Sequence, residues 1–296
     1  MSVPAAYLGM VLIWSTTPLA IKWSSEGIGP WLGVSARMQL GVFICLVLVA
    51  VLSRRILWHA KARKTYLAAG MGIWGAMSSV YWGAQFIPSG MVSVVFGLTP
   101  VLTGLLATLL LAERGFTVFR GVGILFGIAG LALVFANSLQ LGNEQLPGLL
   151  AVLLSVFAHS LSAVCVKRIG AGLHPLETTT GALLIAVPLF WLNWSLGGST
   201  GEIQVTERAL WSILYLGGVA TGFGFVLYYY VLREVSAGTV ALATLITPVI
   251  ALLLGAWLND ERIAVSELVG AAVILLGLAC YQWGDRVLRQ ALAVGR

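Results

Sequence analysis

Charge is what this sequence has least of. Only 9% of its 296 residues are charged, whereas 59% are hydrophobic and the mean hydropathy is +0.96. An ordinary soluble domain has about 25% charged residues, and so few charges cannot cover the surface of a water-soluble globule of this size. The composition excludes a soluble fold and predicts a polytopic membrane protein.

Cysteine and histidine are also scarce. The chain has three of each, and neither set has the spacing of a metal site: Cys45, Cys165, Cys280, His59, His159 and His174. The cysteines lie inside apolar runs without a CxxC pair, which excludes a disulfide framework and a thiolate site. We therefore expect no metal and no cofactor.

Ten apolar segments are long enough to cross a bilayer of about 30 Å. They cover Ala5–Trp23, Trp31–Leu52, Thr65–Ile87, Gly90–Ala112, Phe116–Ala136, Gly148–Ile169, Leu176–Leu196, Ala209–Leu232, Ala237–Leu258 and Val265–Trp283. A Pro-Ser-Gly break at residues 88–90 separates the third from the fourth. The first segment lacks a basic n-region and a cleavage site, so we expect a retained helix.

The basic residues predict the orientation. Three lie in loops on one side, namely Lys22, Arg208 and Arg262. Thirteen lie on the other: Arg54, Arg55, Lys61, Arg63, Lys64, Arg114, Arg120, Lys167, Arg168, Arg233, Arg286, Arg289 and Arg296. Because basic loops resist translocation, both termini are predicted to be cytoplasmic. We expect the membrane to be a bacterial inner (plasma) membrane. This also explains the net charge of +6 without a nucleic-acid partner.

The chain contains an internal repeat. An offset of 148 places Gly90–Arg114 on Gly238–Arg262, with coincident Thr-Pro and Glu-Arg pairs. The loop that follows is one residue shorter in the second copy, so Gly123 aligns with Gly270 and Gly130 with Gly277. At an offset of 145, Lys22 aligns with Lys167. Five spans in each unit make the two copies inverted, an architecture of secondary transporters. We predict an all-α membrane protein of two five-helix repeats, residues 1–140 and 141–296.

These motifs resemble the drug/metabolite transporter superfamily, in its ten-helix EamA-like branch, along essentially the whole chain. The resemblance is carried by Trp14-Ser15-Thr16 to Lys22, by Arg37, by the run from Ser89 to Arg114, and by the second copy ending in Asn259-Asp260-Glu261-Arg262. It implies export or exchange of small metabolites, and the chain looks most like the amino-acid exporters. It departs from the common pattern at His159.

Glycine and proline patterns favour structural roles. The GxGxxG at Gly70–Gly75 lies in an apolar helix without a preceding strand, so it indicates close helix packing and not a nucleotide site. Gly121, Gly123, Gly127, Gly130, Gly270 and Gly277 are interpreted in the same way. Pro100 and Pro248, which are repeat mates, are either static bends or kinks that move as a cavity opens.

Polar and aromatic side chains within the spans give the candidate site. On the third span, Ser78, Tyr81, Trp82 and Gln85 share one helical face, and on the sixth Ser155, His159 and Ser162 do so. From the tyrosines of the eighth span we nominate Tyr228 as a substrate-binding residue. Trp14, Thr99 and Thr247 are nominated from the stretches that carry the family resemblance. We expect Gln85 and His159 to be the buried polar groups of a midplane site. Arg37 is interpreted as snorkelling outward or clamping backbone carbonyls.

No Asp or Glu lies deep in a span. We therefore expect a cavity of aromatic walls and neutral hydrogen-bonding groups without a fixed counter-charge, and transport that does not strictly require a proton gradient. The predicted function is secondary transport of small amphipathic metabolites, foremost amino acids, across the lipid bilayer. The alternatives are a multidrug or nucleoside exporter of the same fold and, outside this class, an intramembrane enzyme, for which Ser155 or Ser162 beside His159 is the candidate, or a channel.

Overall fold

The computed structural model describes residues 2–111, 117–140, 145–197, 203–235, 240, 247–261 and 264–294. Most of these residues are helical, and none of them forms a strand. The helices of the first half are α1 (Val3–Trp23), α2 (Gly29–Val51), α3 (Ala60–Gly83), α4 (Ser89–Phe96), α5 (Thr99–Leu111) and α6 (Val118–Gln140). Those of the second half are α7 (Gln145–Ile169), α8 (Pro175–Gly197), α9 (Glu207–Tyr215), the π-helix η1 (Leu216–Phe223), α10 (Gly224–Glu234), α12 (Thr247–Leu258) and α13 (Val265–Val294).

Six helical stretches of the described chain are long and apolar enough to cross a membrane. They are Val3–Trp23, Gly29–Val51, Ser89–Leu111, Gln145–Ile169, Pro175–Gly197 and Glu207–Glu234, and they coincide with six of the ten predicted spans. Shorter apolar helices cover Val118–Gly130, Thr247–Leu258 and Leu268–Tyr281. The third predicted span corresponds to α3, whose glycine, serine and aromatic residues lower its hydropathy. Of the repeat positions, Glu113, Arg114, Gly238 and Arg262 lie outside the described residues.

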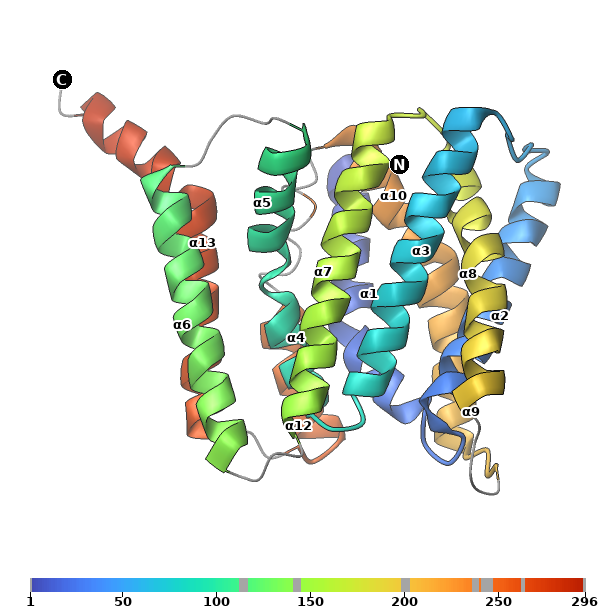
Figure 1. Ribbon diagram of the computed structural model, residues 1–296, viewed down its shortest axis with the longest axis horizontal. Helices are drawn as coiled ribbons and strands as arrows, with labels where there is room; N and C mark the ends of the chain where they lie inside the picture. The colour runs from blue at the N-terminus through green and yellow to red at the C-terminus, as the bar shows by residue number, and fades with distance from the viewer. Residues whose placement is uncertain are drawn as a thin grey trace.

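The fourth predicted span is not one continuous helix. It is divided at Gly97 and Leu98 into α4 and α5, which follow each other along one line in Figure 1. Pro100 has no N–H, so it leaves the carbonyl of Phe96 without its helical donor. The hydroxyl of Thr99 donates to that carbonyl at 2.6 Å instead. Thr99 therefore satisfies a backbone group that lipid could not satisfy.

Glycines let several helices touch backbone to backbone, as the sequence predicts. Helices α6 and α13 run side by side at one flank of the molecule (Figure 1). A Cβ on Gly123 would lie 2.6 Å from the carbonyl oxygen of Gly277, and one on Gly130 would lie 2.6 Å from that of Gly270. Within the GxGxxG stretch, a Cβ on Gly72 would overlap Ser162 of α7, so this motif packs helices.

Serines of α7 complete the packing against α3. The hydroxyl of Ser155 donates to the carbonyl of Ala76 at 2.7 Å, and that of Ser162 donates to the carbonyl of Ala68 at 3.0 Å. Both hydroxyl hydrogens are thus committed to backbone carbonyls and neither is directed at His159. This arrangement gives no support to the serine hydrolase alternative.

Candidate functional site: a pocket between the two halves

A cavity of about 80 Å³ lies among helices of both halves. It is lined by Trp14, Thr17, Pro18 and Ile21 of α1, Arg37 of α2, Met77 and Val80 of α3, Val92, Ser93 and Phe96 of α4, His159 of α7, Ala220 of η1, Phe225 of α10, and Thr247 of α12. Ligand pockets commonly measure roughly 300–1,000 Å³, so this one suits a small ligand or must widen to bind a larger one.

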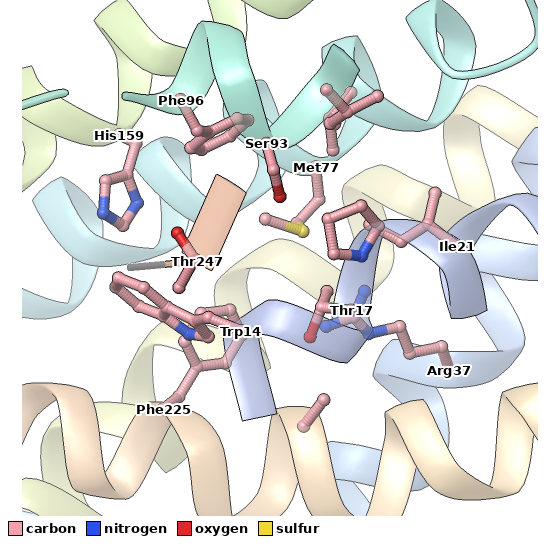
Figure 2. A pocket seen from close by; sticks show the side chains of 14 residues that line it. Trp14, Thr17, Ile21, Arg37, Met77, Ser93, Phe96, His159, Phe225 and Thr247 are labelled. Atoms are coloured by element: carbon pink, nitrogen blue, oxygen red, sulfur yellow. The ribbon is translucent and has the colours of Figure 1, made fainter. Parts of the chain in front are cut away.

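An aromatic cluster forms one end of this pocket, at the left in Figure 2. The ring of His159 lies 5.7 Å from that of Trp14 and 5.2 Å from that of Tyr228, measured between centroids. Phe96 approaches His159 at 6.4 Å, and Trp14 lies 5.5 Å from Tyr228. Four helices, α1, α4, α7 and α10, contribute to this cluster. It offers ring faces and edges to a small apolar or aromatic group.

Arg37 borders the opposite end of the pocket (Figure 2). The residue is only 2% exposed, and its Nε donates to the hydroxyl of Thr221 at 2.9 Å. Its guanidinium carbon lies 5.9 Å from the ring centroid of Tyr81, within cation–π range. The side chain therefore does not snorkel, and its partner is a hydroxyl and not a carbonyl. The expectation of a cavity without a fixed charge is wrong, because a guanidinium lines it.

The π-helix η1 places Thr221 beside Arg37. Glycine-rich sequence allows close approach here, since a Cβ on Gly217 would lie 2.9 Å from the carbonyl oxygen of Arg37. A Cβ on Gly41 of α2 would in turn overlap the side chain of Thr221. Insertions of π-helix into α-helices are frequent at functional sites. The local sequence thus brings a polar group of the second half against the buried cation of the first.

The structure brings together four of the predicted site residues. Trp14, His159 and Thr247 line the pocket, and Tyr228 packs on the first two. Tyr81 is buried behind Arg37, with its hydroxyl 3.2 Å from that of Ser24.

The other residues of the predicted α3 face lie elsewhere. Ser78 and Trp82 line a separate depression between α3 and α7, where Ser78 accepts a hydrogen bond from Asn193 at 2.9 Å. Gln85 is exposed and donates to the carbonyl of Tyr81 at 3.1 Å. The prediction of a buried Gln85 is wrong because α3 ends at Gly83, two residues short of it.

Sequence reasoning missed several lining residues that carried a signal. Trp14, Thr17, Pro18 and Ile21 follow the i, i+3, i+4, i+7 spacing of one helical face, the same pattern that was applied to the third span. Arg37 is the one lysine or arginine that the count of loop charges assigns to neither side of the membrane. Ser93 and Phe96 carried a weaker signal, because the break of the helix at Gly97 cannot be located from hydropathy.

A polar cluster joins three helices at the end of the bundle nearest Ile21. Glu261, with a side chain 5% exposed, accepts from the backbone N–H of Ser89 at 3.0 Å and from its hydroxyl at 3.0 Å. Lys22 lies 3.5 Å from the same carboxylate, and Asn259 donates to it at 3.0 Å while accepting from Trp23 at 2.8 Å. Burial raises the pKa of Glu261, but the bonds from Ser89 and Asn259 and the charge of Lys22 leave it below its ordinary value.

Comparison with known proteins identifies the family. A family model described as the EamA-like transporter family matches residues 3–136 and again residues 146–282. The chain belongs to this family. It is a multi-pass membrane protein with transporters as its relatives.

Individual relatives are distant in sequence but match over more than nine-tenths of their length. The chain is 26% identical to the uncharacterized transporter YoaV of Bacillus subtilis (strain 168), over 92% of this chain and 93% of that one. It is 24% identical to a "probable amino-acid metabolite efflux pump" of Escherichia coli (strain K12), over 97% and 96%. A crystal structure with 19% identity superimposes with a TM-score of 0.72 over 97% of this chain and 99% of the other, and this likeness concerns the fold alone.

Proposed function

We propose that this EamA-like protein is a secondary transporter that exports or exchanges small amphipathic metabolites, foremost amino acids, by alternating access. The observation that carries the proposal is the pocket itself, to which both halves contribute. Its aromatic cluster uses Trp14 and Phe96 from the first half and His159 and Tyr228 from the second. A site at the junction of two repeats is where secondary transporters bind their substrates.

Three observations support an inverted repeat of ten spans. The family model matches the chain twice, in stretches of similar length. The glycines that sequence alignment pairs, 123 with 270 and 130 with 277, make crossed contacts in which Gly123 meets Gly277 and Gly130 meets Gly270. When each glycine is replaced by its repeat mate, the contact between Gly123 and Gly277 becomes the contact between Gly270 and Gly130. A pseudo-two-fold axis between α6 and α13 requires this relationship. The helices α3, α6, α12 and α13 supply the spans beyond the six most apolar ones.

The distribution of charge and the shared location of the two ends support the proposed orientation. The first residues of α1 and the last turns of α13 lie at the same edge of the bundle in Figure 1. The basic-residue bias assigns that edge to the cytoplasm of a bacterial inner membrane. In this orientation the cluster of Lys22, Ser89 and Glu261 closes the end of the bundle that faces away from the cytoplasm. Separation of these three residues would expose Ile21 and the pocket that Ile21 lines. In this scheme transport follows the substrate gradient and does not strictly require a proton gradient.

Amino acids are the preferred substrates of this proposal for two reasons. One is the name of the relatives from Escherichia coli and Salmonella typhimurium, described as probable amino-acid metabolite efflux pumps. The other is the combination of a small apolar pocket with a polar end, which suits a molecule with one hydrophobic side and one charged side.

Counterflow in proteoliposomes tests the proposal. Vesicles preloaded with unlabelled leucine should accumulate labelled leucine transiently and with saturation, whereas a channel would not saturate. Trp14→Ala should reduce this uptake strongly, since Trp14 lines the pocket. Trp257→Ala is the matched control, because that tryptophan is 80% exposed on α12 and should leave uptake unchanged. Absence of counterflow for every amino acid in a panel, with folded protein in the vesicles, would contradict the proposal.

A further inference from the structure

The guanidinium of Arg37 is a buried charge that is only partly satisfied by the protein. Its Nη1 is buried and has no hydrogen-bond partner among the described residues. Among the described residues, no acidic side chain forms an ion pair with Arg37. Buried charges in membrane proteins are otherwise paired, and unpaired ones mark pathways and sites.

We propose that Arg37 is the carboxylate-binding group of the pocket. This inference rests on the transport function proposed above and specifies the substrate class. The side chain lines the cavity and is already held by Thr221 through Nε, and its Nη1 is a buried donor without an acceptor among the described residues. A carboxylate placed there would supply both the missing acceptor and the missing negative charge, in a charge-assisted hydrogen bond.

The remainder of the pocket determines what the carboxylate is attached to. Met77 lies between the two ends, Ile21 lies on the side of Arg37, and the aromatic cluster closes the far end (Figure 2). Both residues are apolar, as is the lining residue Val80. Among the lining residues that the structure describes, none is acidic and able to recognise an ammonium group. The substrates are therefore small monocarboxylates with an apolar body, amino acids included, and recognition depends on the carboxylate more than on the amine.

Three compounds of similar shape separate these requirements. Leucine has both charged groups, 4-methylpentanoate lacks the amine, and isoamylamine lacks the carboxylate. We expect unlabelled leucine and 4-methylpentanoate each to compete with labelled leucine in the proteoliposome assay and to raise the melting temperature of the detergent-solubilised protein. Isoamylamine should bind at least tenfold more weakly, since it loses a charge-assisted hydrogen bond and places a cation near Arg37.

Variants of the arginine complete the test. Arg37→Met should weaken the apparent affinity for leucine and for 4-methylpentanoate on the order of tenfold to a hundredfold. Its melting temperature without ligand should not fall, because an unpaired buried charge has been removed, and this separates binding from folding. Arg37→Lys should keep the preference for carboxylates. Arg55→Met is the matched control, since Arg55 is exposed in the loop between α2 and α3.

The outcomes distinguish this inference from the proposed function. Leucine counterflow that isoamylamine inhibits as well as 4-methylpentanoate does would overturn the carboxylate site and leave the transport function intact. A carboxylate-dependent thermal shift that Arg37→Met abolishes, without flux of any amino acid, would support the site and contradict the transport of amino acids. An unchanged thermal shift in Arg37→Met, or no shift by either carboxylate in the unmodified protein, rejects the inference.

Discussion

The Nε of Arg37 and the hydroxyl of Thr221 lie 2.9 Å apart although 184 positions separate them in the sequence. This bond joins α2 of the first half to η1 of the second, directly behind the pocket. Because glycines at positions 41 and 217 hold the two backbones close, the bond fixes the direction of the guanidinium and not only its depth.

Thr221→Val should weaken substrate affinity while leaving the fold intact. Valine keeps the shape of threonine but cannot accept the bond from Arg37, so the guanidinium loses its anchor. We expect the apparent affinity for leucine to fall roughly fivefold or more, as for the loss of a hydrogen bond to a charged group. Thr221→Ser retains the hydroxyl and serves as the control. Equal affinities for the two variants in the counterflow assay would show that the bond does not position Arg37.

His159→Asp should abolish transport without preventing insertion. A carboxylate within the membrane costs about 2.5–3.5 kcal/mol on insertion scales, and here it would stand between Trp14 and Tyr228. The new negative charge would also compete with the substrate for the cation at the other end of the pocket. His159→Phe keeps the ring contacts and should retain abundance and part of the uptake. Full transport by well-expressed His159→Ala would remove this residue from the site.

Glu261→Gln should open the end of the bundle that Lys22 and Ser89 close. The amide loses the ion pair and cannot accept from all of its present donors. A cysteine at Ile21, in a background without the native cysteines, would report this opening through faster labelling by an impermeant thiol reagent. Gln85→Ala, at an exposed position just beyond the end of α3, is a suitable control. Identical labelling rates with Glu and Gln at position 261 would argue against a closing role.

Acid should weaken the same cluster. The pKa of Glu261 lies below its ordinary value of 4.5, so ionised Glu261 contributes stability that is fully present above that pH. The contribution is lost as the pH falls through the lowered pKa. Because thiol reactivity itself falls with pH, the labelling rates of a cysteine at Ile21 should be compared between the proteins with Glu and Gln at position 261 at each pH. The Gln protein should label faster above about pH 4.5, and the two rates should converge below it. Convergence near neutrality would assign the effect to another group.

The two ends of the bundle should be accessible from opposite sides of the membrane. A cysteine at Gln204 should react with an impermeant reagent applied to intact cells, and one at Lys61 should react only after the membrane is opened. The reason is the bias of basic residues toward the loop that contains Lys61. The reverse labelling pattern would invert the proposed orientation.

Hydropathy located the helices well because burial in lipid requires long apolar segments whatever their neighbours are. Which face of a helix points toward the pocket depends on packing between helices, and the sequence predicted these faces only in part. His159 and Trp14 meet as expected. Gln85 does not join them, since the end of α3 at Gly83 removes it from the helical face on which its assignment depended.

The charge of the pocket was missed for a different reason. Arg37 lies near one end of its span, where snorkelling is the usual outcome for a long basic side chain. Its burial follows from glycines at positions 41 and 217, which admit η1 so closely that the side chain has no path outward. A π-helix 184 positions away is not visible from the neighbourhood of Arg37 in the sequence.

The crossed glycine contacts of α6 and α13 form an isologous interface within one polypeptide. Each helix presents the same patch to the other, and this is the relationship found between the subunits of a symmetric dimer. Such a surface needs no covalent connection to be self-complementary. Under the inverted repeat proposed above, each half carries one side of an interface that matches itself in the opposite orientation, as each subunit of an antiparallel homodimer does.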